Sequence, residues 1–184
     1  TTSAAPSGLT CTTTVSSFPY SEGFESGFGS WSQGSGDDFD WTRKTGSTAS
    51  SNTGPASASG GSYYLYMESS SPNNSSDVAI LNGPCFDLGS ASSSTLTFKY
   101  HMYGASNMGN LKLQASTTDG SWTDIWSKAG NQGNAWATAT VDMAAYVGTN
   151  VKLRFYGTTG STWQGDMAID DLSMTTGGGS GGGT

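Results

Sequence analysis

Apolar and polar residues alternate in several short segments of the chain, which is the pattern of half-buried β-strands. These segments are Tyr63–Glu68, Val78–Leu81, Thr95–Tyr103, Asn110–Ser116, Ala135–Val141, Asn150–Tyr156 and Asp166–Met174. An early strand runs through Phe24–Glu25, and Val141–Val147 can form one short helical turn at most. No segment of convincing length has the 3.6-residue period of an amphipathic helix. The pattern therefore predicts an all-β fold, a two-sheet antiparallel β-sandwich.

Alternation also assigns the side chains of each strand to two faces. For three of the strands the inward set is Leu96, Phe98, Tyr100, Met102, Leu111, Leu113, Ala115, Val151, Leu153 and Phe155. The outward set is Lys99, His101, Tyr103, Lys112, Gln114, Lys152, Arg154 and Tyr156. A short turn separates the strands at 95–103 and 110–116, so these two are expected to pair as a hairpin. If all three strands share one sheet, that sheet has a basic, tyrosine-bearing outer face.

Composition narrows the class of protein. The net charge of −7 disfavours wrapping of DNA or RNA, whereas six Trp, eight Tyr and seven Phe supply a core and disfavour disorder. The ends, residues 1–10 and 175–184, read as linkers, so residues 11–174 are expected to form a single module. No signal peptide or membrane-spanning run is present, which predicts a mature, soluble segment with no membrane partner.

The two cysteines, Cys11 and Cys85, lie 74 residues apart. A disulfide between them would stabilise the fold by about 4 kcal/mol in the chain-entropy model and would place the protein outside the cytoplasm. Two buried free thiols are the alternative. A structural zinc site is excluded because two cysteines and one distant histidine cannot supply four ligands.

Catalytic residues are scarce in this sequence. His101 is the only histidine and lies in the middle of a strand, away from any nucleophile motif. The chain has only three glutamates, Glu22, Glu25 and Glu68, and lacks both the H-E-x-x-H motif and a phosphate-binding loop. We therefore expect a binding module and not an enzyme.

A series of short motifs resembles the MAM domain family. In order along the chain they are FESGFGSW (24–31), DDFDWTR (37–43), TGP (53–55), GSYYLYMES (61–69), NGPCFDL (82–88), LTFKYHMYG (96–104), GNQGNAW (130–136), LRFYG (153–157) and AIDDL (168–172). The resemblance implies a jelly-roll β-sandwich in extracellular proteins. In animals such domains mediate adhesion or oligomerisation, and in bacteria they accompany secreted proteases and polysaccharide-degrading enzymes. The chain departs from the animal pattern in having few cysteines and in the residues after Pro55, which are ASAS.

Acidic residues cluster in the early and late strands. The candidate ligands of a structural calcium ion are Glu25, Asp38, Asp40, Asp170 and Asp171. If the first and last strands are neighbours, these carboxylates meet at one edge, and without a cation they would repel one another. The arrangement resembles the calcium site of jelly-roll carbohydrate-binding modules. The alternative is that the aspartates cap turns and accept backbone N–H bonds.

The outward basic residues suggest a ligand. Arg, Lys and aromatic side chains together suit an anionic glycan, with Arg43 and Trp163 as candidate rim residues beside the outward set. An ordinary solvated face is the alternative. The sequence thus predicts a monomeric, secreted, non-catalytic carbohydrate-binding module that tethers a catalytic domain of the same parent chain to a polysaccharide, an anionic one by preference. The competing hypothesis is an extracellular protein–protein interaction or adhesion module.

Overall fold

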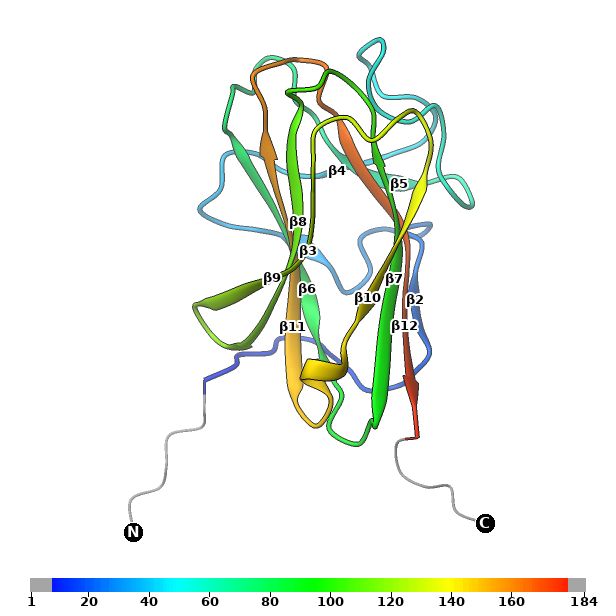
Figure 1. Cartoon of the computed structure of the whole chain (residues 1–184), viewed down its shortest axis with the longest axis vertical. Coiled ribbons are helices and arrows are strands. Elements are labelled where there is room, and N and C mark those ends of the chain that lie inside the picture. Colours follow the sequence, from blue (N-terminus) through cyan, green and yellow to red (C-terminus); the bar gives the residue numbers. More distant parts are fainter. Residues whose placement is uncertain (1–7, 179–184) are drawn as a thin grey trace.

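The computed structural model describes residues 8–178, and β-strands dominate it (Figure 1). The strands are β1 (Thr14–Val15), β2 (Tyr20–Glu22), β3 (Ser32–Gln33), β4 (Thr42–Lys44), β5 (Tyr64–Met67), β6 (Val78–Asp87), β7 (Ser93–Met102), β8 (Gly109–Thr118), β9 (Ser121–Ala129), β10 (Ala137–Asp142), β11 (Asn150–Thr159) and β12 (Met167–Gly177). One 3₁₀ turn, η1 (Ala144–Tyr146), lies inside the segment expected to hold a single helical turn. All the strands predicted from residue 63 onward are confirmed.

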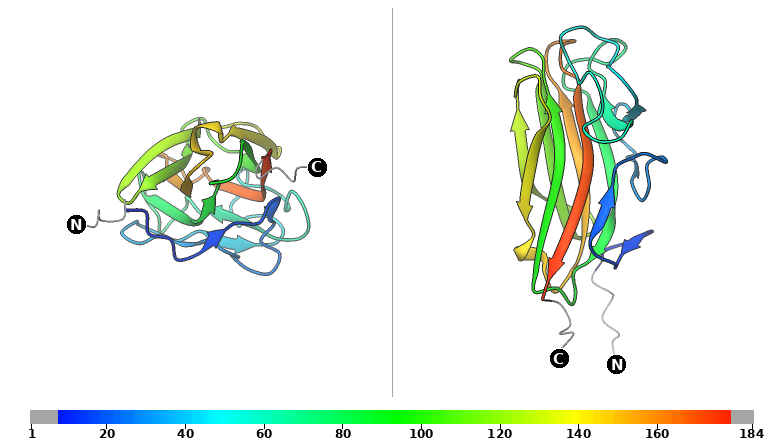
Figure 2. Two further views of the ribbon diagram at one scale, coloured as in Figure 1. Left: turned by 90° about the horizontal axis from the view of Figure 1, so that it is seen from below. Right: turned by 90° about the vertical axis from the view of Figure 1, so that its right-hand side faces the viewer.

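The strands form two sheets that face each other, as Figure 2 shows from the side. The first sheet has the order β1-β6-β11-β8-β9, with β3 also paired to β6. The second has the order β10-β7-β12-β5-β4, with β2 also paired to β12. Every pairing is antiparallel except the short parallel contact of β1 with β6. The predicted jelly-roll β-sandwich is confirmed.

The core lies between the two sheets and contains the whole predicted inward set. Phe98 of β7 and Phe155 of β11 meet across the interface, with ring centroids 5.1 Å apart. Trp31 covers Gly83 of β6, where an added Cβ would lie 2.8 Å from the indole ring. Each large side chain buried in this way contributes roughly 1.5–3 kcal/mol, so the interface between the sheets is the main source of stability.

The predicted hairpin between the strands at 95–103 and 110–116 is wrong, because β7 and β8 belong to different sheets. β8 pairs instead with β9, through a tight turn at Asp119–Gly120. Gly120 has φ +82, a left-handed conformation that glycine adopts without strain. Asp-Gly between alternating segments is a strong hairpin signal, whereas the connection at 104–109 carries the chain from one sheet to the other.

The N-terminal part of the described chain is fastened to the first sheet. Cys11 and Cys85 form the predicted disulfide, with their Cα atoms 5.7 Å apart. The early strand, β2, ends at Glu22, so Phe24 and Glu25 follow it and do not lie within it. β12 extends to Gly177, three residues into the segment expected to be a linker. Residues 8–10 of the predicted N-terminal linker are also described, and the N–H of Thr10 donates to Asp119. Residues 1–7 and 179–184 of the two predicted linkers lie outside the described residues.

The two ends of the sandwich differ. The turn at 88–92, η1 and both ends of the described chain lie at one end, and the long connections around residues 45–62, 68–77 and 160–166 lie at the other (Figure 1). Among the described residues, no helix is long and apolar enough to cross a membrane.

Candidate ligand-binding face

Three adjacent strands of the first sheet, β8, β9 and β11, place a set of polar and aromatic side chains on its outer surface. Register pairs Arg154 with Gln114, and Tyr156 with Lys112. Gln114 in turn lies opposite Asp124 on β9. We call this surface the Arg154 face; its residues are Lys112, Gln114, Trp122, Asp124, Lys152, Arg154 and Tyr156. It holds three basic side chains and one acidic side chain in a protein whose net charge is −7.

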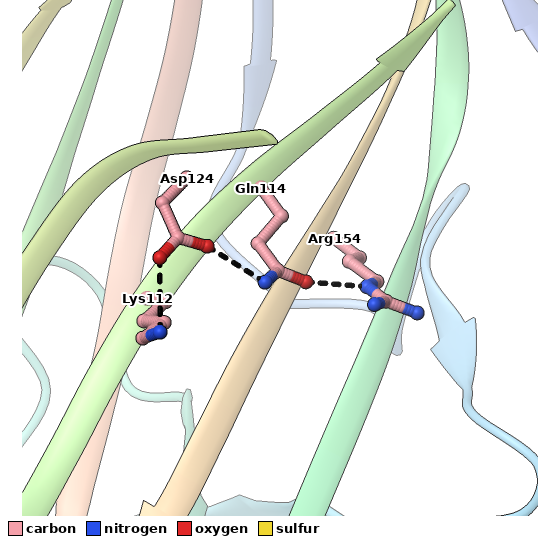
Figure 3. A network of polar contacts seen from close by, with 4 residues as sticks. All are labelled: Lys112, Gln114, Asp124 and Arg154. Carbon is pink, nitrogen blue, oxygen red and sulfur yellow. Dashed lines mark hydrogen bonds and ion pairs between the residues drawn. The ribbon is translucent and has the colours of Figure 1, made fainter. Parts of the chain in front are cut away.

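A chain of polar contacts crosses these strands (Figure 3). Lys112 Nζ lies 2.9 Å from Asp124 Oδ2, Gln114 Nε2 donates to Asp124 Oδ1 at 2.8 Å, and Arg154 Nε donates to Gln114 Oε1 at 2.7 Å. Hydrogen bonds from Gln114 and Lys112 lower the pKa of Asp124, so this carboxylate stays ionised. The exposed ion pair contributes at most about 1 kcal/mol of stability, so its main effect is to fix the orientation of Gln114 and through it Arg154.

Two aromatic rings flank the guanidinium of Arg154. Its Cζ lies 4.1 Å from the ring centroid of Trp122 and 5.3 Å from that of Tyr156. Among the described residues only Gln114 hydrogen-bonds to this guanidinium, and the bond comes from Nε of Arg154. The two terminal nitrogens of Arg154 therefore remain available. A planar donor held in this way can bind a carboxylate or sulfate group through two parallel hydrogen bonds.

The structure brings together only half of the ten residues predicted to bind carbohydrate. Lys112, Gln114, Lys152, Arg154 and Tyr156 share the Arg154 face, and Lys152 also contacts the carbonyl of Thr10 at 3.4 Å. The single basic face drawn from three strands is wrong, because β7 lies in the second sheet. The residues that lie elsewhere are Arg43, Lys99, His101, Tyr103 and Trp163.

Lys99 and His101 occupy the outer surface of the second sheet. Lys99 Nζ donates to the hydroxyl of Thr138 on β10. His101 is 2% exposed because Trp136 packs against its ring, with centroids 5.4 Å apart. Burial lowers the pKa of His101, and its Nε2 contacts Asn134 Oδ1 at 3.2 Å, so a neutral imidazole that donates from Nε2 fits the site. In this structure His101 is a buried group that packs against Trp136.

Arg43 and Tyr103 also have local partners. Arg43 stacks on Tyr63, 3.4 Å from the ring centroid, and donates to the carbonyl oxygens of Phe24 and Glu25 at 2.6 Å. It therefore holds the segment after β2 against β4. Tyr103 lies beside a polar pocket of about 420 Å³, walled by residues 47–56 and Asn134. Neither side chain extends the Arg154 face.

The predicted calcium ligands are not gathered into one site. β2 does pair with β12, as expected of the first and last strands. Asp38, however, accepts the N–H of Val78 at 2.8 Å, on the first sheet. Within residues 8–178, no three acidic, histidine or cysteine side chains are placed to hold a metal ion together. The five carboxylates are therefore spread over more than one place, and Asp38 acts as a backbone cap.

Three of the predicted ligands do converge on the segment at 59–63. Glu25 accepts the N–H groups of Ser62 and Tyr63, and Asp170 accepts those of Ser59 and Gly60. An added Cβ on Gly60 would lie 2.6 Å from Asp171 Oδ2. Burial, with the charge of Asp171, raises the pKa of Asp170 to about 6. Glu25 and Asp170 thus accept backbone N–H groups of the loop and hold it in place. This is the alternative role, capping of turns, that the sequence left open for these aspartate and glutamate side chains.

A carboxyl pair at the loop end has no counterpart in the sequence-based prediction. Asp166 is fully buried, and its Oδ2 has no hydrogen-bond partner among the described residues. Burial, with the nearby Glu68, raises the pKa of Asp166 to about 7. Burial acts to raise the pKa of Glu68 as well, but hydrogen bonds from the backbone and hydroxyl of Ser70 outweigh it and lower that pKa. These directions fit a neutral Asp166 beside an ionised Glu68.

The fold defines a jelly-roll β-sandwich, one sheet of which carries the polar Arg154 face. Comparison with known families agrees, because the model of the MAM domain, meprin/A5/mu, matches residues 23–178. The chain belongs to the MAM domain family, as its motifs predict.

A curated relative and two solved structures illustrate the similarity. MAM domain-containing glycosylphosphatidylinositol anchor protein 1 of Rattus norvegicus is 36% identical over 150 residues, which cover 77% of this chain and 15% of the relative. The chain thus spans only a small part of that relative. The K1 cleaved adhesin domain of Lys-gingipain from Porphyromonas gingivalis has a TM-score of 0.60 at 22% identity, covering 88% of this chain and 100% of that domain. TmCBM61 in complex with beta-1,4-galactotriose has a TM-score of 0.56 at 18% identity, covering 84% and 94%. At these identities the structures establish the fold, which is that of carbohydrate-binding modules.

Proposed function

We propose that this chain is a non-catalytic, extracellular polysaccharide-binding module that holds an anionic glycan on the Arg154 face. The observation that carries the proposal is the guanidinium of Arg154, fixed between Trp122 and Tyr156 with both terminal nitrogens available. Lys112 and Lys152 add positive charge on the same strands. A sulfate or carboxylate group would bind Arg154, and neighbouring hydroxyl groups of the glycan would bind Gln114 and the lysines.

Reversible binding to a polysaccharide is useful to a protein that has other domains attached to the module. A module that binds a polymer reversibly raises the local concentration of any domain attached to it. We propose that the parent chain carries such a domain, catalytic or adhesive, and that this module supplies attachment to the polysaccharide.

The test of this proposal is affinity electrophoresis through gels that contain sulfated or uronic acid polysaccharides. Arg154→Ala should weaken retardation by about tenfold or more, because it removes a bidentate, charge-assisted contact. Arg154→Lys should restore only part of it, since an ammonium group cannot form the same fork. Binding should also weaken as salt is raised.

The matched control is Lys99→Ala. It removes the same charge from an outward strand position, but on the second sheet, where Lys99 contacts Thr138. Retardation should be unchanged. If Lys99→Ala weakens binding as much as Arg154→Ala, or if no anionic polysaccharide retards the protein, the Arg154 face is not the site.

A protein–protein adhesion module is the second candidate, and the relatives that belong to anchored MAM proteins favour it. Adhesion through an apolar surface requires a broad exposed patch. In residues 8–178 the only exposed large hydrophobic side chain is Trp163. A dimer that forms with rising concentration in light scattering, together with no binding to any glycan, would favour adhesion.

A further inference from the structure

The β5–β6 and β11–β12 connections lie at the end of the sandwich opposite the ends of the described chain (Figure 1). A groove is found at these connections. It has a volume of about 300 Å³ and lies between the β5–β6 and β11–β12 connections. We call it the loop-end groove; its lining residues are Ser69, Ser71, Asn73, Asn74, Ser75, Gly160, Ser161, Thr162 and Trp163. The Arg154 face contributes none of these residues.

The walls of this groove are fixed by hydrogen bonds between the two connections. Ser69 Oγ donates to the carbonyl of Trp163 at 2.8 Å, and the N–H of Ser76 donates to the carbonyl of Thr159 at 3.1 Å. An added Cβ on Gly160 would lie 1.7 Å from the carbonyl oxygen of Asn107. The backbones at Gly160 and Asn107 therefore approach so closely that only glycine fits at position 160. A groove built in this way needs little ordering when a ligand binds.

The apolar part of the groove is the indole of Trp163. This side chain is 51% exposed, unlike Trp31 and Trp41, which are buried in the core. A single exposed hydrophobic residue on a surface is common and needs no explanation. Here, however, the exposed indole is part of the lining of a preformed groove, so a ligand that enters can contact it.

The polar part of the groove carries hydroxyl and amide groups and no charged side chain. The amide of Asn73 is used on the carbonyl of Glu68, at 2.8 Å. Among residues 8–178, the side-chain amide of Asn74 makes only a long contact, 3.5 Å, to the carbonyl of Pro72. Neutral hydroxyl and amide groups beside an aromatic face match the hydroxyl groups and apolar ring face of an uncharged sugar. They offer nothing to neutralise a phosphate or a carboxylate.

We propose that the loop-end groove is a second carbohydrate site, which takes an uncharged oligosaccharide with one sugar ring against Trp163 and hydroxyl groups bonded to Asn74 and the groove serines. It is independent of the Arg154 face in position and in chemistry. The module would then hold an anionic and a neutral glycan at separate places.

The experiment is affinity electrophoresis of the whole chain against soluble neutral polysaccharides: galactan, glucomannan and xylan. At least one should retard the protein, and retardation should persist at about 1 M NaCl, where the screening length is roughly 3 Å. Trp163→Ala should weaken it by about tenfold, and Trp163→Phe, which keeps an aromatic ring, by less. Arg154→Ala should leave it unchanged.

Unchanged melting temperatures of the Trp163 variants would show that the fold is intact, as expected for a half-exposed side chain. If no neutral polysaccharide is bound, or if Trp163→Ala binds as well as the wild type, the proposal is overturned. Because anionic gels report on Arg154 and neutral gels on Trp163, failure of one site is distinguishable from failure of the other.

Discussion

Asp166 is a buried carboxyl that stays protonated in the folded protein at mildly acidic pH, next to Glu68 and close to the rings of Tyr64 and Tyr66. Its pKa is about 7 in the folded protein, against roughly 4 in an unfolded chain. Between these values the folded state binds a proton that the unfolded state releases. The free energy of unfolding should therefore fall as pH rises from about 4 to 7, by up to about 4 kcal/mol, and then level off.

The measurement is urea unfolding at a series of pH values, with Asp166→Asn as the comparison. The amide cannot ionise, so the variant should lose this part of the pH dependence and should be more stable than the wild type at pH values above about 7. Burial also raises the pKa of Asp170 to about 6, so in both proteins this group makes the free energy of unfolding fall as pH rises from about 4 to 6. Parallel curves for the two proteins would show that Asp166 is not the group that titrates.

Single residues show what alternation can predict and what it cannot. The inward positions were predicted correctly, because the two-residue period fixes the face once a strand is identified. His101 obeys the same alternation but is buried on its outward side, since the segment containing Asn134 and Trp136 folds over it. Such a contact joins residues 33 or more positions apart, and no local pattern encodes it.

Among the elements, the β8–β9 hairpin decides which residues meet on the Arg154 face. Trp122 and Asp124 reach Arg154 and Gln114 only because β9 folds back along β8. The Asp119–Gly120 turn is the sequence signal that could have identified both residues as part of the site. A neighbouring short connection suggested a hairpin from β7 to β8, which the packing of β7 into the second sheet replaces.

The loop at 59–63 and the bulge of β12 at Asp170–Asp171 are the places where calcium binding can be tested. Glu25, Asp170 and Asp171 bring negative charge to this loop, so a divalent cation bound with carbonyl and water oxygens would relieve their repulsion. If calcium is structural, EDTA should lower the melting temperature by several degrees and added calcium should restore it. Glu25→Gln should reduce this difference.

Magnesium added in place of calcium after EDTA is the control, since it binds poorly to irregular oxygen sites. If the melting temperature is the same with EDTA and with calcium, calcium is not part of the fold. The carboxylates would then serve only to accept the backbone N–H groups of the loop.

At the scale of the whole molecule, the assignment of strands to sheets separates residues that the sequence grouped together. Lys99 and Arg154 have equivalent outward positions in similar strands, yet they lie on opposite surfaces of the sandwich. Sheet membership depends on the order in which many strands pair, and that order is set by the packing of the complete core. The fold class was therefore predictable from the sequence, whereas the composition of the Arg154 face was not.

The arrangement of ends and sites leads to a last prediction. The N–H of Ser92 donates to the carbonyl of Gly177, so the C-terminal end of the described chain lies at the end of the sandwich opposite the loop-end groove. The Arg154 face lies along the side of the sandwich, on the first sheet. The N-terminal segment, in contrast, passes Lys152. A large inert protein fused after residue 184 should leave the affinities for both neutral and anionic polysaccharides unchanged in gel electrophoresis. The same protein inserted between Asn74 and Ser75 should abolish neutral binding alone, because it blocks the groove. Loss of both activities on C-terminal fusion would mean that the ligand lies at the opposite end, near the turn at 88–92.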